Sequence, residues 1–264
     1  MFSFFKKEIN QDIIVSMTCI PSRIHLVEKS IRSILNQSIQ PYKIILYLCK
    51  DDYFGNNAIK PEKVPKKLYK YSNKGLISIR WVKNIGPYTK LIPAIRDFPR
   101  KSIVTADDDT IYPKKWLEKL LDKHHQNKNA IICYKGARMI LNSGGFERYN
   151  SWPEFKNNQD SLLLFFKGKD GVLYPPNSLD LEVFNEKKFK QLSPFADDIW
   201  FNAMAIKNDT KKIKVKDSHV DFKLIKGSFQ VTLSSLNVDQ MKNDIYLNNV
   251  FKNYNLFKKL TSDC

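Results

Sequence analysis

Apolar and polar positions along the first hundred residues follow the pattern of short buried strands separated by amphipathic helices. Residues 13–17 are continuously apolar, and from Ile24 to Leu35 apolar residues recur at helical spacing. A second apolar run covers residues 43–48. The first fifty residues therefore predict a strand, a helix and a strand, which is one βαβ unit of a parallel sheet with a right-handed crossover.

The rest of the chain continues this alternation up to one long interruption. The pattern predicts strands at 77–82, 102–106 and 130–134, and helices at 91–96, after Pro113, from Asp197 and within 239–260. Residues 142–180 contain several glycines and prolines and show no regular period. We expect that segment to be an irregular functional loop region. The pattern as a whole indicates an α/β fold.

Length and composition favour one catalytic unit without a membrane span. The 264 residues include 42% hydrophobic residues, enough for a sizeable core, and no apolar stretch approaches about 18 residues. The apolar cluster 1–5 is too short for a signal peptide. The cysteines show no CxxC spacing, which argues against a zinc site or a disulfide framework; they are Cys19, Cys49, Cys133 and Cys264. These features predict a cytoplasmic protein with reduced thiols.

The charge of the chain is strongly positive and is carried mainly by lysine. The formal net charge is +17, and only seven residues are arginine. Lysine excess indicates diffuse attraction to anionic surfaces, and it allows peripheral contact with the inner face of the plasma membrane. The alternative is a plain compositional bias of a chain rich in Lys, Asn and Ile, and both readings stay open. The sequence contains no helix-turn-helix, zinc or aromatic RNA-binding motif, so we expect no nucleic-acid partner.

Three consecutive aspartates, Asp107, Asp108 and Asp109, follow the predicted strand 102–106 directly. Ligands of open α/β sheets bind beyond the carboxyl ends of the strands. Carboxylates at positions i and i+2 suit Mn²⁺ or Mg²⁺, and such an ion would bridge a diphosphate and stabilise the charge of a departing nucleotide. The alternative is an ordinary surface turn, in which Asp is common.

A second acidic group, Asp197 and Asp198, opens a predicted helix. The helix dipole favours the ionised carboxylate at this end, and a sugar hydroxyl that attacks an anomeric carbon needs an ionised proton acceptor. The alternative is simple capping of the helix.

Together these segments resemble glycosyltransferases of the GT-A fold, and among them bacterial enzymes that assemble capsule and lipopolysaccharide glycans. The resemblance covers about residues 11–258, and its segments are SIRSILNQSIQPYKIILYL, NIGPYTKLIPAI, TADDDTIYP, DGVLYPPNSL and PFADDIWFNAMAIKN. It implies a single GT-A domain over 1–264 with a central, mostly parallel sheet flanked by helices. Residues 11–110 would be the nucleotide-binding half, and 111–264 the acceptor-binding half with a C-terminal helix.

The resemblance also implies a reaction: metal-dependent transfer of a sugar from a nucleotide-diphosphate sugar, with a UDP-sugar favoured, to a surface glycan or lipid-linked glycan. Asp109 would be the principal ligand of Mn²⁺ or Mg²⁺. Asp107 and Asp108 would contact the nucleotide ribose or support the metal. Asp198 would be the general base of an inverting displacement, and Asp197 would orient the acceptor.

Further positions are assigned by the same resemblance. Thr18 and Arg23 would line the base and phosphate pocket, and Lys90 would meet the diphosphate. On the acceptor side, Gly171 would offer a backbone contact and Trp152 a platform for a sugar ring.

The sequence departs from the family pattern in three places. The acidic residue usual after the second strand is shifted here to Asp51-Asp52, so neither is assigned. Lys169-Asp170-Gly171 stands where relatives often have two glycines. His219 is either a third metal ligand or a structural histidine, and the sequence leaves both open.

Two other functions compete with the glycosyltransferase. A phosphatase of the haloacid dehalogenase type also ends a strand in Asp-x-Asp, but Thr110 stands one place too early for that motif, which moreover opens the fold in such enzymes. A basic nucleic-acid or membrane-binding module would explain the charge alone.

Overall fold

The structure is a computed structural model, described for residues 8–51, 58–142, 145–156, 160–216, 222–228 and 242–261. Within these residues seven strands form one sheet, in the order β10-β6-β9-β4-β1-β2-β3. Its strands are β1 (Ile9–Thr18), β2 (Gln40–Cys49), β3 (Ser78–Val82), β4 (Ser102–Ala106), β6 (Ile131–Arg138), β9 (Leu164–Tyr174) and β10 (Lys212–Lys214). Neighbouring strands run parallel except around β9, which is antiparallel to both β4 and β6. The predicted mostly parallel α/β sheet is confirmed.

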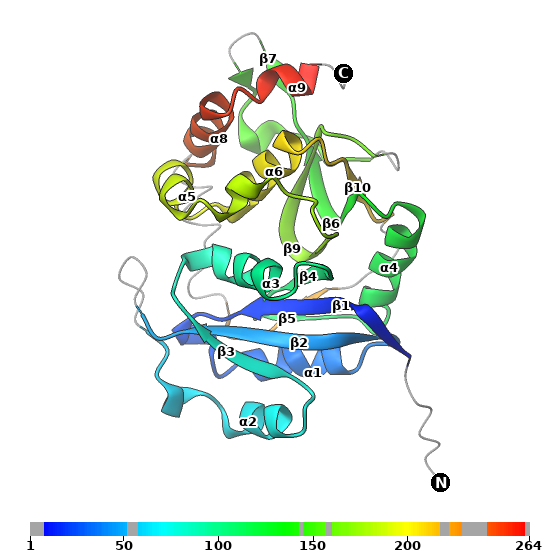
Figure 1. Cartoon of the computed structure of the whole chain (residues 1–264), viewed down its shortest axis with the longest axis vertical. Coiled ribbons are helices and arrows are strands. Elements are labelled where there is room, and N and C mark those ends of the chain that lie inside the picture. Colours follow the sequence, from blue (N-terminus) through cyan, green and yellow to red (C-terminus); the bar gives the residue numbers. More distant parts are fainter. Residues whose placement is uncertain are drawn as a thin grey trace.

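Helices flank the sheet on both sides (Figure 1). They are α1 (Val27–Leu35), α2 (Lys66–Asn73), α3 (Ile92–Asp97), α4 (Trp116–Gln126), α5 (Glu186–Leu192), α6 (Asp197–Lys207), α8 (Lys242–Asn253) and α9 (Phe257–Thr261). Short 3-10 turns complete the described chain: η1 (Pro21–Arg23), η2 (Pro61–Lys63), η3 (Gly86–Lys90), η4 (Tyr149–Ser151) and η5 (Leu181–Phe184). Two small antiparallel pairs lie outside the main sheet, β5 (Thr110–Ile111) with β11 (Lys223–Leu224) and β7 (Leu141–Asn142) with β8 (Gly145–Phe146).

Two hydrophobic cores hold this arrangement, one on each face of the sheet. One core includes buried side chains of α3, α5, α6, α8 and α9, and the other includes those of α1, α2 and α4. The helical spacing seen in the sequence explains the contacts: α1 buries Val27, Ile31 and Ile34, while α4 buries Leu117 and Leu120. A parallel sheet covered on both faces needs strands that are apolar on both sides, and β4 is buried at all five positions.

The prediction for residues 142–180 is wrong in its main part. This segment contains β9, an eleven-residue strand in the interior of the sheet. Its sequence, LFFKGKDGVLY, does not predict a strand, because two glycines and three charged residues interrupt the apolar run. The interruption corresponds to a large bulge.

We call residues 168–171 the β9 bulge. Cys133 pairs with Val172, but two positions later Lys135 already pairs with Lys167, so β9 has several more residues than β6 between these two pairings. The backbone of the bulge is left-handed at Asp170 (φ 68°) and Gly171 (φ 107°). A bulge of this kind bends its strand and re-aims backbone groups, and such bulges often lie next to active sites.

The predicted C-terminal helix is two helices rather than one. α8 ends at Asn253, and α9 starts at Phe257 after Asn255, whose φ of 52° ends the first helix. Among the described residues no helix combines the length and the apolar character needed to cross a membrane. Cys19, Cys49 and Cys133 are buried free thiols.

Candidate active site

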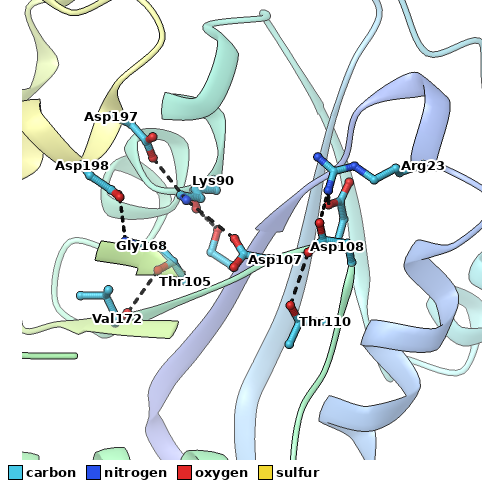
Figure 2. Close-up of polar contacts among 12 residues, drawn as sticks. Arg23, Lys90, Thr105, Asp107, Asp108, Thr110, Gly168, Val172, Asp197 and Asp198 are labelled. Atoms are coloured by element: carbon cyan, nitrogen blue, oxygen red, sulfur yellow. Dashed lines mark hydrogen bonds and ion pairs between the residues drawn. The ribbon is translucent and has the colours of Figure 1, made fainter. Parts of the chain in front are cut away.

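Four segments bring charged side chains together at the carboxyl ends of β1 and β4. The acidic triplet (Asp107, Asp108, Asp109) follows β4, and η1 with Arg23 follows β1. The 3-10 turn η3 contributes Lys90, and the first turn of α6 contributes the acidic pair (Asp197, Asp198). Figure 2 shows the cations interleaved with the two acidic groups.

Lys90 bridges the two acidic groups. Its Nζ lies 3.3 Å from Asp197 Oδ2 and 3.8 Å from Asp107 Oδ1, and its side chain is only 15% exposed. Burial alone would lower the pKa of Lys90, but the carboxylates of Asp197, Asp107 and Asp198 raise it above the usual range. Lys90 is therefore a fixed positive charge in the centre of the site.

Arg23 neutralises the other side of the triplet. Its guanidinium lies 3.2 Å from Asp108 and donates a hydrogen bond to Asp109. Asp108 also accepts a hydrogen bond of 3.3 Å from the Ile20 amide, and it is 6% exposed. Burial raises the pKa of Asp108 to about 6, and burial likewise raises the pKa of Asp107. The triplet carries more negative charge than the protein cations around it balance.

Asp198 has a different environment from the triplet. One carboxylate oxygen accepts a hydrogen bond of 2.8 Å from the Gly168 amide, and the other is buried without a hydrogen-bond partner in the described part of the chain. Burial and the neighbouring Asp197 raise the pKa of Asp198 to about 7. A carboxylate with this pKa can accept a proton near neutral pH and release it again.

The β9 bulge supplies backbone contacts to both acidic groups. The Gly168 amide binds Asp198, and the Asp170 amide hydrogen-bonds to Asp107. A Cβ atom at Gly168 would lie 2.5 Å from Asp198 Oδ1 and 3.0 Å from Lys90 Nζ. A larger residue at this position would have to displace both groups, because the Asp198 carboxylate and the Lys90 ammonium converge on it. Sequence analysis assigned no role to Gly168 or Asp170; the pair Gly168 and Gly171, three residues apart in an apolar run, was the available signal.

Tyr88 ties the lysine segment to the helix that carries the acidic pair. Its hydroxyl donates to the Ser193 carbonyl and lies 2.9 Å from the Ser193 hydroxyl, and its ring stacks on Phe189 at 4.0 Å. The Lys90 carbonyl is itself held by the Ser16 hydroxyl at 2.5 Å. Asn202 then fastens α6 to β9 through both backbone groups of Phe166. These contacts fix Lys90 and Asp198 relative to each other, and sequence analysis assigned no role to Tyr88.

A family model for glycosyl transferase family 2 matches residues 17–184, which is more than half of the chain. The chain belongs to glycosyltransferase family 2. This confirms the predicted class of enzyme and removes the phosphatase and the stand-alone basic module as alternatives. The match includes β4, the acidic triplet, Lys90 and the β9 bulge, and it ends before the acidic pair.

Crystal structures of S. aureus TarS share the fold of this family 2 chain. TarS 1–349 has a TM-score of 0.53 and 12% identity, with 89% of this chain and 64% of that chain covered. Its complex with UDP-GlcNAc has a TM-score of 0.53 and 13% identity, with 91% and 73% covered. Its complex with UDP has a TM-score of 0.51 and 12% identity, with 79% and 59% covered. No curated protein matches the sequence significantly.

Two further residues that were predicted for the site of this glycosyltransferase, Thr18 and Gly171, lie against other protein groups. The Thr18 hydroxyl donates to the Tyr47 carbonyl at 3.0 Å, at the end of β1. Gly171 faces Trp116, whose indole a Cβ would approach to 2.7 Å, so Gly168 and not Gly171 is the glycine beside Asp198. His219 and Asp52 lie outside the described residues.

Trp152 lies in an aromatic cluster rather than on an open surface. Its ring packs near those of Phe146, Tyr149 and Phe165, and its Nε1 donates to the Glu147 carbonyl at 3.1 Å. With 7% of its surface exposed, it offers little area for a sugar ring. The structure thus assigns Trp152 to the core.

The acidic triplet offers oxygen ligands of the kind that a divalent cation takes. No preformed cluster of three or more possible ligands occurs among the residues that the structure describes. Mg²⁺ is nevertheless usually bound by one or two carboxylates, with substrate phosphates and water as further ligands. Asp107 and Asp109 provide two hard oxygen ligands at a ligand-binding edge of the sheet, with side chains 24% and 17% exposed.

Proposed function

We propose that this chain transfers a sugar from a nucleoside diphosphate sugar to a hydroxyl group of a surface glycan or lipid-linked glycan, with inversion at the anomeric carbon. The observation that carries the proposal is the position of Lys90, which separates an acidic triplet suited to a cation from an acidic pair that contains a carboxylate with a pKa near 7. A leaving diphosphate and an attacking hydroxyl require these two environments.

On the donor side, Arg23 and Lys90 would hold the diphosphate by charge, since both are positive and lie beside the triplet. Asp109 and Asp107 would hold Mn²⁺ or Mg²⁺, which when bound would neutralise charge on the departing diphosphate. The TarS complexes with UDP and UDP-GlcNAc support a uridine nucleotide as the donor class.

On the acceptor side, the hydroxyl oxygen would form the new bond to the anomeric carbon while the bond from that carbon to the diphosphate oxygen breaks. The hydroxyl proton would pass to Asp198, whose carboxylate the Gly168 amide orients. Asp197 keeps Lys90 in place through its ion pair and would also orient the acceptor. Because Asp198 accepts the proton of an external hydroxyl, no protein nucleophile is needed.

The first test is the thermal stability of the chain with UDP, GDP or CDP, each with and without Mn²⁺. A ligand at a hundredfold excess over its Kd, bound only by the folded state, stabilises it by about 2.7 kcal/mol. We expect a shift with UDP that requires Mn²⁺ and that is lost in Asp109→Asn but kept in Asp122→Asn, an exposed control on α4. If no nucleotide shifts the melting temperature, the donor site is assigned to the wrong place.

A further inference from the structure

A basic surface extends over α1, η2 and α2, on helices that take no part in the site described above. We call it the α1–α2 basic face. Its cationic residues are all exposed: Lys29, Arg32, Lys60, Lys63, Lys66, Lys67, Lys70 and Lys74. Residues 25–35 and 60–76 contain two carboxylates, Glu28 and Glu62, against these eight cations. The carboxylates of these segments therefore cannot balance the positive charge of the face.

The two helices form one continuous surface. Glu28 on α1 accepts a hydrogen bond from Tyr71 of α2 at 2.8 Å, and it pairs with Lys67 at 3.0 Å. Figure 1 shows both helices on the same side of the sheet, at the end of the molecule away from α5, α8 and α9. Of the eight cations, only Lys67 has a carboxylate within ion-pairing distance in the described ranges. The other seven cations are exposed, have no carboxylate of the described residues at that distance, and are free to pair with an external anion.

Exposed apolar side chains lie among these lysines. Tyr69 is 37% exposed and Leu76 is 44% exposed, and both belong to the same segment as six of the lysines. An exposed tyrosine and an exposed leucine in a lysine-rich segment match the interface of a bilayer, where headgroups attract the charges and the ring and alkyl groups reach the acyl boundary.

We propose that the α1–α2 basic face binds the anionic headgroups of a lipid bilayer. Charge complementarity favours lipid over nucleic acid. Seven of the eight cations are lysines, which act as point charges toward a diffuse anionic surface, whereas base and phosphate readout prefers the bidentate fork of arginine.

The test compares charge reversal on this face with a matched reversal elsewhere. The variant Lys63→Glu, Lys66→Glu, Lys70→Glu changes three exposed residues of the face, and the control Lys114→Glu, Lys115→Glu, Lys128→Glu changes three exposed residues at and around α4. Both lower the net charge equally. We measure co-sedimentation with vesicles of phosphatidylcholine alone and of phosphatidylcholine mixed with phosphatidylglycerol, and we follow UDP-dependent thermal shifts in parallel.

The unmodified chain should sediment with the anionic vesicles only, and added salt should release it, because screening shortens the range of the attraction. The variant on the face should lose about tenfold or more in vesicle affinity, while the control loses little. Equal losses in both variants would mean that net charge alone is responsible, which overturns the proposal. Tighter binding to a single-stranded oligonucleotide than to the vesicles, lost in the same variant, would overturn it in favour of nucleic acid.

A second variant, Tyr69→Ser with Leu76→Ser, tests the apolar part without a change in charge. It should leave the anionic vesicles at a lower salt concentration than the unmodified chain does, because the apolar contribution that it loses is not screened. Neither variant changes a residue of the donor or acceptor site, so the UDP-dependent shift should persist in both. If no form of the chain showed the UDP-dependent shift, the proposed function would be contradicted, and the proposal of lipid binding would be unaffected.

Discussion

The two acidic groups of the site differ in how their charge is balanced. In the acidic triplet, Arg23 contacts two of the three carboxylates, and Lys90 lies 3.8 Å from the third. In the acidic pair, Lys90 contacts Asp197 only, while Asp198 has one amide donor and one buried oxygen without a partner among the described residues.

This difference separates two kinds of chemistry. Carboxylates that already sit among cations and still keep partly exposed oxygens are suited to exchange one cation for another, as metal and donor binding require. A single carboxylate that is desolvated next to a second one is suited to bind a proton. Residues of the same type thus acquire different roles through their neighbours.

The largest effect should come from Asp198→Asn, which removes the proton acceptor and keeps the side-chain shape. We expect the rate of transfer, or of hydrolysis of the donor sugar, to fall by about 10²–10⁴-fold, the usual contribution of a positioned base. Nucleotide-dependent thermal stabilisation should remain, because the donor side is intact. In the unmodified chain kcat/KM should rise with pH around the pKa of about 7 of Asp198. Full activity in the variant would assign the base elsewhere.

The next effect concerns the other acidic group. Asp109→Asn should abolish the part of nucleotide binding that depends on Mn²⁺, an expected loss of about tenfold or more in affinity, while binding without metal changes little. Titration of UDP with and without Mn²⁺ measures this directly. If Asp109→Asn and Asp198→Asn affected binding equally, the division of labour between the two acidic groups would be wrong.

Gly168→Ala should disturb the close approach of Asp198 and Lys90 to the β9 bulge. The added methyl group would clash with Asp198 and Lys90, so we expect about tenfold lower turnover and a loss of about 1–3 kcal/mol in the free energy of unfolding. Gly75→Ala is the matched control: Gly75 has a φ of 71° but nothing within 4 Å of its Cβ position. Its variant should lose stability through backbone strain and keep its activity. Equal activity losses would show that instability, and not the clash at the base, is the cause.

The last effect leaves activity aside and concerns stability as a function of pH. Burial and Asp197 raise the pKa of Asp198 in the folded state to about 7, above its unfolded value of about 4, so the folded state holds the proton more tightly. The associated stability is present at low pH and is lost as pH rises through the folded pKa.

Asp198→Asn removes this dependence, and the variant should therefore gain stability relative to the unmodified chain between about pH 5 and about pH 8. We expect roughly 1–3 kcal/mol, which is several degrees in melting temperature. Thermal melts at both pH values measure it, with Asp122→Asn as an exposed control. A relative loss at the higher pH would mean that Asp198 is stabilised as a carboxylate and is not poised to take up a proton.

Most of the fold could be predicted from the sequence because its strands and helices obey simple periods. The β1-α1-β2 unit is encoded by apolar runs and helical spacing that the structure reproduces. β9 could not be predicted in this way. Its central position is determined by pairing with β4 and β6, and its own sequence contains glycines and charges that serve the bulge.

The same limit applies to the site. Arg23, Lys90 and both acidic groups lie at or next to the ends of strands and helices, positions that sequence patterns can predict. The structure brings these residues together. Gly168 and Tyr88 act through backbone approach and through a contact with Ser193, more than a hundred positions from Tyr88, which no local pattern encodes. The roles assigned to these residues remain predictions for the experiments above.

The antiparallel strand β9 has a mechanical consequence. It hydrogen-bonds on one side to β4, which leads into the acidic triplet, and on the other to β6 in the following part of the chain. The two parts of the chain cannot separate unless the backbone hydrogen bonds that β9 makes to β4 or to β6 break. The spacing between the acidic triplet after β4 and the rest of the site is thus set when the protein folds.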